Sequence, residues 1–272
     1  MKYDLCIWAK NGGKVLPFSL KRIDEVIPHE VVGSKILADD HSTDETVKIA
    51  KEFNWTVYPN TFGGLAAGAS LCLQKVKTPQ FISFEQDVVL ARNWFEKIPS
   101  YLEDPKVAVA QGWRISPHPV IGKIDLVNMT NPKNMKCSID NNVYRTDVIK
   151  NVGIPSYCGG AVDSFVQEHV EKYGYKWIVD FSVVSEHLRL DGLKEMTRRL
   201  FMYGYTYPYD FSGRRLGSII ATVESPIRAF KIAVQKSCPL VVFYFPLMRL
   251  SQLNGTLCRG KTGRRRCARG VN

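Results

Sequence analysis

The sequence QFISFEQDVVL, residues 80–90, places two carboxylates at the end of an apolar run. The apolar first half predicts a buried β-strand, and Glu85 and Asp87 stand where that strand ends. A carboxylate without a partner is unfavourable in such surroundings, so we expect a cation beside these two side chains. The stretch therefore predicts a sheet that carries a charged site at the end of one strand.

On both sides of this stretch, short apolar runs alternate with helical patterns, as a sheet built from βα units requires. In HSTDETVKIAKEF, residues 41–53, Ser42 and Glu45 form a capping-box pattern, which predicts a helix just past Asp40. Another helix is expected near residues 15–26. The expected strands are residues 3–9, 34–39, 55–59, 81–85 and 107–113.

Two later segments carry different signals. Residues 117–138 are rich in Pro, Asn and Lys and have weak periodicity, which predicts a mobile loop over a site. A further helix is expected after the Gly159–Gly160 turn, with Ser164 and Gln167 as its capping box and Gly174 at its end.

Acidic side chains recur where the strands end and where a helix begins. Open α/β sheets bind ligands along that edge. Carboxylates clustered there repel one another unless a cation intervenes, and oxygen ligands at this density suit Mg²⁺ or Mn²⁺. A divalent ion in turn favours an anionic substrate, most often a diphosphate. The residues concerned are Asp39, Asp40, Glu85, Asp87, Asp163 and, more loosely, Glu186.

Four segments in this order resemble the family 2 glycosyltransferases with the GT-A fold. The resemblance covers roughly residues 3–190, and the ordered set is far more specific than any one segment. It implies an α/β protein with a Rossmann-like mixed sheet flanked by helices, the fold of nucleotide-diphospho-sugar transferases. The segments are ILADDHSTDET (36–46), FISFEQDVVL (81–90), GGAVDSFVQEHVEKYGYKW (159–177) and SEH (185–187).

The resemblance also implies roles for individual residues. Asp87 and His187 would hold Mn²⁺ or Mg²⁺, which would neutralise the departing nucleoside diphosphate. Asp163 would be the catalytic base that takes the proton from the acceptor hydroxyl as it attacks, and one in-line displacement implies inversion. The nucleotide-sugar donor would be bound by Ala9, Asn11, Asp39, Asp40, Glu85 and Gln86.

The sequence departs from the family pattern at three places. Glu85 replaces the first Asp of the Asp-x-Asp motif, which leaves Asp87 as the surer metal ligand. Val162 replaces the first carboxylate of the Glu-Asp pair at the base position, so only Asp163 remains there. The segment NTFGGLAAGAS, residues 60–70, lacks the arginine that many relatives carry. The phosphate charge must therefore be neutralised by the metal or by another group.

Each of these residues also fits a purely structural role. Asp39 or Asp40 can precede a helix, and Asp163 can cap one, although the helix dipole would also steady the charge of a base there. His187 fits an ordinary, partly buried histidine. The chain could also be a catalytically inactive sugar-binding module of the same fold, but the presence of Asp87 and Asp163 argues against this alternative.

The charge of the chain is unevenly distributed. Residues 1–192 contain 22 Lys and Arg against 23 Asp and Glu, whereas residues 193–272 contain 15 against 3. We therefore expect a GT-A catalytic domain over residues 1–192 and a basic, amphipathic helical region over residues 193–272 with a different partner. The longest apolar run, Pro239–Met248, has ten residues, and about 20 are needed to span a bilayer.

Basic side chains alternate with long apolar and aromatic ones from about residue 225 onward, which suits a segment in the membrane interface. The expected function is inverting, metal-dependent transfer from a nucleotide sugar to a lipid-linked acceptor at an anionic membrane surface. GDP-mannose is favoured over a UDP-sugar by analogy with lipid-directed family members. The expected location is the cytoplasmic face of a membrane, without a spanning helix or a cleaved signal.

Three alternatives remain for the C-terminal region and the acceptor. The helices after residue 193 also fit ordinary core helices with a solvated basic tail. The enzyme could then be soluble and act on a protein or saccharide acceptor. GKTGRRRCARG, residues 260–270, alone would suit contacts with nucleic acid, but that function leaves the acidic edge unexplained, so no nucleic-acid partner is expected.

Overall fold

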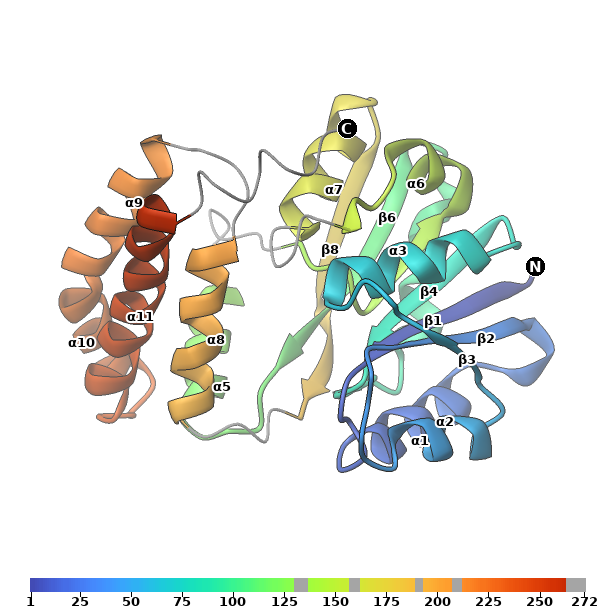
Figure 1. Ribbon diagram of the computed structural model, residues 1–272, viewed down its shortest axis with the longest axis horizontal. Coiled ribbons are helices and arrows are strands. Elements are labelled where there is room, and N and C mark those ends of the chain that lie inside the picture. Colours follow the sequence, from blue (N-terminus) through green and yellow to red (C-terminus); the bar gives the residue numbers. More distant parts are fainter. Residues whose placement is uncertain (130–136, 157–161, 189–192, 207–211, 263–272) are drawn as a thin grey trace. The chain divides into compact units, whose positions relative to one another are not determined.

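The computed structural model describes residues 1–129, 137–156, 162–188, 193–206 and 212–262. The chain divides into two compact units (Figure 1). Unit 1 comprises Met1–Pro117 and Asn131–Arg189, and unit 2 comprises His118–Thr130 and Leu190–Asn272. Unit 1 contains the sheet, and the described part of unit 2 is helical.

The sheet of unit 1 has eight strands in the order β3-β2-β1-β4-β7-β6-β8-β5. All neighbouring pairs are parallel except those that involve β7 and the pair β5–β8. The result is a mixed sheet, as expected. The strands are β1 (Tyr3–Ala9), β2 (Val32–Asp39), β3 (Thr56–Pro59), β4 (Gln80–Glu85), β5 (Val88–Val89), β6 (Val107–Ile115), β7 (Asn142–Arg145) and β8 (Lys176–His187).

Helices cover both faces of this sheet (Figure 1). One core cluster joins the sheet to α1 (Leu16–Val26), α2 (Thr46–Glu52), α4 (Trp94–Lys97) and the 3₁₀ helix η2 (Pro99–Glu103). The second cluster joins the other face to α3 (Leu65–Lys75), α6 (Thr146–Val152) and α7 (Val162–Lys172). A short 3₁₀ helix, η1 (His29–Val31), precedes β2. Both faces are apolar, so the polar residues of the strands concentrate at the strand ends.

The strand ends fix where the site can lie. β1, β2 and β4 are parallel neighbours, and their registers place Ala9 opposite Asp39 and Trp8 opposite Glu85. β6 and β8 run in the same direction as β4, because β7 between β4 and β6 is antiparallel to both. The carboxyl ends of β1, β2, β4, β6 and β8 therefore meet at one edge, where open α/β sheets bind ligands.

The five predicted strands and the helix near residues 15–26 are confirmed, with shifts of a few residues at their ends. The capping box of Ser42 and Glu45 is wrong, because Ser42 Oγ accepts a hydrogen bond from the Asn11 N–H instead. α2 begins at Thr46, whose N–H donates to Asp44 Oδ1 at 3.0 Å. A side chain bound across the fold is not available as a cap.

Two other local predictions also need correction. α7 begins at Val162, so Ser164 lies inside the helix and not at its start. Residues 117–138 contain a helix, α5 (Ile121–Met129), where a loop was predicted. The predicted Gly159–Gly160 turn lies outside the described residues.

Unit 2 has a small apolar core of its own, formed by Val120, Ile124, Ala229, Ile232, Val241 and Phe245. Two of its helices touch backbone to backbone, since a Cβ at Gly204 or Gly255 would overlap a carbonyl oxygen of the other helix. No helix in the described part of the chain has the length and apolar character to cross a membrane. The helices are α5, α8 (Leu193–Thr206), α9 (Ser212–Val223), α10 (Ser225–Gln235) and α11 (Val241–Thr262).

Candidate active site

The ends of β1 and β2 bring three predicted donor-binding residues together. Asn11 adopts φ 48° and its Oδ1 accepts the Thr43 N–H at 2.9 Å. Asp39 Oδ2 accepts the Ser42 N–H at 3.1 Å, whereas Asp39 Oδ1 is buried and has no hydrogen-bond partner among the described residues. A buried carboxylate oxygen without a partner is unfavourable, so it is ready to accept from a ligand.

Asp40 is held beside Asp39 by groups of positive character. Its Oδ2 lies 3.1 Å from Lys10 Nζ and 3.0 Å from the Gly64 N–H that donates to it. Burial alone would raise the pKa of Asp40, but the hydrogen bonds from Gly64, His41 and Lys10 lower it below the ordinary value. Gly64 has φ 84°, a conformation that favours glycine. Asp40 is therefore ionised and fixed at neutral pH.

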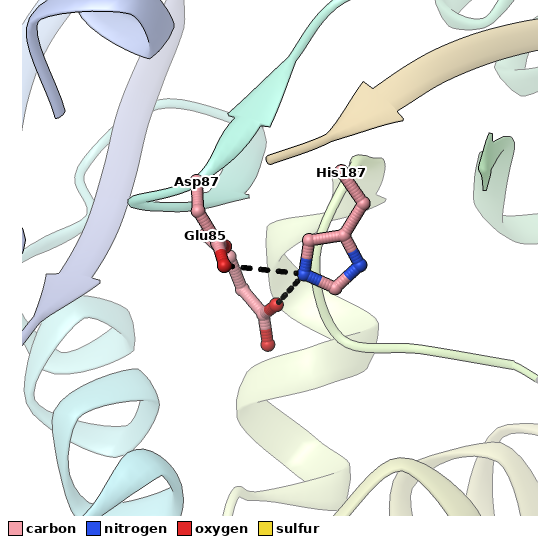
Figure 2. Close-up of side chains that lie close together, drawn as sticks. All are labelled: Glu85, Asp87 and His187. Atoms are coloured by element: carbon pink, nitrogen blue, oxygen red, sulfur yellow. Dashed lines mark ion pairs between the residues drawn. The ribbon is translucent and has the colours of Figure 1, made fainter. Parts of the chain in front are cut away.

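Three potential metal ligands converge at the ends of β4 and β8 (Figure 2). His187 Nε2 lies 3.3 Å from Asp87 Oδ2 and 3.6 Å from Glu85 Oε2. One ligand atom from each of the three residues lies within 4.8 Å of the other two. Ligands about 2.1 Å from one octahedral ion are about 3–4 Å apart, so the spacing and the donor types fit a divalent ion.

The two-residue strand β5 is what positions the histidine. Val88 pairs with His187 and Val89 with Glu186, so the end of β8 lies against the chain that has just left β4. The Leu188 N–H also donates to the Asp87 carbonyl oxygen at 2.7 Å. Side chains alternate across the strand, so His187 is buried while Glu186 is exposed. Glu186, which the sequence placed only loosely at this edge, does not belong to the cluster of potential ligands.

A partly buried arginine lies among these carboxylates, and sequence reasoning missed it. Arg114, near the end of β6, forms an ion pair of 2.9 Å with Asp140, which is fully buried. Its Nε donates to His187 Nδ1 at 3.1 Å. Arg114 therefore connects the histidine of the potential metal site with Asp140, another residue that the sequence did not single out.

The charges of the cluster are out of balance without a further cation. Burial raises the pKa of Glu85 well above its ordinary value, and the charges of Asp140, Asp87 and Asp163 add to the effect, against the opposing charge of Arg114. The pKa of Arg114 is raised by the same carboxylates, although burial acts in the opposite direction. One guanidinium thus faces four carboxylates, and a divalent cation would relieve their repulsion.

Asp163 stands in the first turn of α7. Its Oδ1 accepts the Ile139 N–H at 3.0 Å, which fixes the orientation of the carboxyl group. Burial and the charge of Asp140 raise the pKa of Asp163 to about 7, against the opposing effects of Arg114 and the Ile139 hydrogen bond. A carboxyl group with this pKa is suited to accept a proton near neutral pH.

Two other predicted donor-binding residues have structural contacts. Ala9 is buried, and its carbonyl oxygen accepts the Asp40 N–H at 2.8 Å. The Gln86 side chain bridges to β1, since its Oε1 accepts the Lys10 N–H at 2.8 Å and its Nε2 donates to the Lys10 carbonyl at 3.2 Å. Gln86 thereby ties the end of β4 to the end of β1. Contacts of both residues with a donor stay predictions, as do the roles of the other site residues.

Residues 6–160 match a family model described as "Glycosyl transferase family 2", which is more than half of the chain. No curated protein matches the sequence. The match ends before β8, so it does not include His187.

Three solved structures of similar fold contain a nucleotide or a nucleotide sugar. The mannosyltransferase PcManGT from Pyrobaculum calidifontis, in complex with GDP-Man and Mn²⁺, is 16% identical, with a TM-score of 0.59 over 100% of this chain and 76% of its own. S. aureus TarS 1–349 with UDP-GlcNAc is 11% identical, with a TM-score of 0.57 over 97% and 92%. Glucosyl-3-phosphoglycerate synthase from Mycobacterium tuberculosis, with Mn²⁺ and UDP, is 12% identical, with a TM-score of 0.53 over 82% and 79%.

Proposed function

The chain belongs to glycosyl transferase family 2, and from that premise we propose that it moves a sugar from a nucleoside-diphosphate sugar to a lipid-linked acceptor, with a divalent metal and with inversion. The observation that carries the proposal is the convergence of Glu85, Asp87 and His187 beside Asp39 and Asp40 at one edge of the sheet. The acceptor group would be a hydroxyl or a phosphate. In this reaction the donor diphosphate and the carboxylates of the site are both negatively charged, so a cation bound between them would relieve their repulsion.

The donor would lie along the ends of β1, β2 and β4. Asp39 Oδ1 has no partner among the described residues and is suited to accept an N–H of a nucleotide base. Lys10 is 59% exposed at its side chain and lies at the same edge, where its charge can reach a phosphate. We favour GDP-mannose over a UDP-sugar as the donor, on the analogy with PcManGT, while TarS and the mycobacterial synthase support a UDP-sugar as the alternative.

The residues that would hold the metal favour Mn²⁺ over Mg²⁺. Mg²⁺ prefers oxygen ligands, whereas an imidazole is a better ligand for the later transition metals and is also accepted by Mn²⁺. His187 supplies an imidazole nitrogen, and Glu85 and Asp87 supply carboxylate oxygens. When bound, the ion supplies positive charge that stabilises the departing diphosphate.

Asp163 would accept the proton of the acceptor hydroxyl. One of its oxygens is engaged by the Ile139 N–H, and its pKa of about 7 leaves it partly ionised at neutral pH. Arg114 contacts both Asp140 and His187, so it fixes the orientation of the histidine ring and contributes positive charge near the base. Attack by a single activated hydroxyl on the face opposite the leaving diphosphate inverts the anomeric carbon.

The lipid-linked acceptor is proposed from the basic C-terminal region. Residues 193–272 carry 15 Lys and Arg against 3 acidic residues, which suits an anionic membrane surface on its cytoplasmic face. A soluble enzyme with a protein or saccharide acceptor is the alternative. The family match lies in residues 6–160 and leaves the acceptor open.

Thermal unfolding of the full chain with GDP-mannose, UDP-glucose and UDP-GlcNAc, each with Mn²⁺ or with EDTA, tests the proposal. A ligand at a hundred times its Kd stabilises the fold by about 2.7 kcal/mol, a shift of about 5–10 °C in Tm for a chain of this size. We expect one donor to produce such a shift only with Mn²⁺, and Asp87→Ala to abolish it. Asp147→Ala, the same change at an exposed carboxyl group of α6, is the matched control. Equal shifts in EDTA, or in Asp87→Ala, would refute the metal assignment.

A further inference from the structure

Helices α9 and α10 continue into one another through Glu224. The Glu224 N–H donates to the Ile220 carbonyl at 2.9 Å, and the Arg228 N–H donates to the Glu224 carbonyl at 3.1 Å. These are the i to i−4 hydrogen bonds of an α-helix, so the helical rotation of about 100° per residue carries across the junction. Side chains of α9 and α10 can therefore share one face.

Six apolar side chains occupy such a face, and we call them the apolar stripe. At about 100° per residue they fall within an arc of about 100°, the width of the apolar face of an amphipathic helix. Each is exposed, by 41–73% of its surface. They are Ile219, Ile220, Val223, Ile227, Phe230 and Val234.

The opposite face of α10 is already buried. Ala229 and Ile232 belong to the core of unit 2, and Ser225 is buried beside them. The same rotation places these three residues about 130–170° from the middle of the apolar stripe. The stripe is therefore not the core-facing side of the helix turned outward, but a second apolar surface. Contiguous exposed apolar surface of this kind marks an interaction site.

We propose that the apolar stripe docks the protein on an anionic lipid membrane, with the helix in the plane of the interface. Because it names the partner of the proposed reaction, the inference rests on the proposed function. Residues 212–235 contain four Lys and Arg and one acidic residue, Glu224. Lys231 is exposed and lies next to the stripe on the helical wheel, with Arg228 beyond it. Cations beside an inserted apolar face are attracted by anionic headgroups.

Charge argues for a membrane over a second copy of this chain as the occupant. Residues 212–235, which carry the stripe, contain four Lys and Arg against one acidic residue, so two copies would repel one another across the contact. An anionic bilayer neutralises the same charges.

Co-sedimentation of the full chain with phosphatidylcholine vesicles, with and without 30% phosphatidylglycerol, tests the inference without any sugar donor. The double variant Ile227→Ser, Phe230→Ser should lower the partition coefficient by tenfold or more, roughly the effect of removing one buried aromatic. Lys231→Glu removes one positive charge and adds a negative one, and each change should lower the partition coefficient by about fivefold. Phe18→Ser is the matched control, because Phe18 is 60% exposed on α1 of unit 1 and Phe230 is 65% exposed.

We expect wild type and Phe18→Ser to bind only the anionic vesicles. The double variant and Lys231→Glu should bind weakly, and all four proteins should have the same Tm. Equal binding by all four proteins, or binding indifferent to phosphatidylglycerol, overturns the inference. So does a wild-type dimer that the stripe variant breaks, or duplex DNA binding at 150 mM salt without lipid binding. If the double variant fails to fold, Lys231→Glu decides. If no sugar donor raises the Tm but the protein still binds vesicles, the proposed enzyme function is wrong and the docking inference stands.

Discussion

Replacing Asp163 by Asn removes the proposed base and keeps its shape. Asn still accepts the Ile139 N–H through its side-chain oxygen, so α7 and donor binding should survive. With a pKa of about 7, Asp163 is ionised to about 10% at pH 6 and about 90% at pH 8 in the free enzyme. Wild-type kcat/KM should therefore rise with pH, by about tenfold over this range, and the positive charge of a bound Mn²⁺ would move the rise to lower pH. The variant should be slower by roughly 10²–10⁴-fold, without this rise.

The assay measures transfer from GDP-mannose, or from the donor that the thermal shifts select, to a short lipid-linked saccharide, whose attacking group is a hydroxyl, in Mn²⁺. Asp147→Asn is the control for this variant. It makes the same change in the first turn of a helix, α6, at an exposed side chain. A variant of Asp163 with wild-type turnover, or one whose kcat/KM keeps the wild-type rise with pH, would refute the assignment of the base. The donor-induced shift in Tm separates a lost base from lost binding.

The same pKa makes a stability prediction with a defined sign. An unfolded Asp has a pKa near 3.9, so the folded chain holds the proton of Asp163 more tightly than the unfolded chain does. The stability that this proton contributes is present below about pH 4 and is lost as the pH rises to about 7. In EDTA, Asp163→Asn should therefore gain Tm relative to wild type between pH 5 and pH 8. No change in the difference would contradict a raised pKa.

Two further predictions concern the ion pair of Arg114 and the close contact of two helices. Arg114→Met should destabilise the protein by about 3–5 kcal/mol, because it leaves Asp140 buried and unpaired. It should strengthen Mn²⁺ binding measured by electron paramagnetic resonance, because it removes the positive charge among the carboxylates and the hydrogen bond to His187 Nδ1 that keeps the imidazole proton on Nε2. Unchanged Mn²⁺ affinity would limit Arg114 to stability. Gly255→Ala should lower the Tm because its Cβ meets the Phe201 carbonyl, whereas Gly217→Ala, with open space around its Cβ, should be neutral or stabilising by about 0.5–1 kcal/mol in denaturant unfolding. Equal effects would contradict the close crossing of α8 and α11.

The sequence predicted the site best where an apolar strand ends in a carboxylate. Asp39 and Glu85 close β2 and β4, and parallel neighbours bring such ends to one edge without any knowledge of the rest of the fold. The same reasoning should have found Arg114, which stands near the end of the predicted strand at residues 107–113. The missed signal was a charge that follows an apolar run, of the opposite sign to the others.

Asp140 had no such signal. It precedes β7, a four-residue strand that pairs antiparallel with β4 and β6, partners about 30 to 60 residues away in the sequence. Pairing at that distance leaves no local period in a short strand. The wrong capping boxes have a related cause. Ser42 has the right spacing for a cap, but the Asn11 N–H, 31 residues earlier, binds its hydroxyl in the folded chain. Local preference yields when a tertiary partner offers a better bond.

Because β5 pairs with the end of β8, the three potential ligands come together only late in the synthesis of the chain. Glu85 and Asp87 leave the ribosome about 100 residues before His187, which is about 5–20 s at ordinary elongation rates. During that interval a nascent chain has the two carboxylates but not the imidazole, and β8 has not closed the sheet edge. Full metal affinity would therefore arise only once the last strand of the sheet has docked, so bound metal would report that the domain is finished.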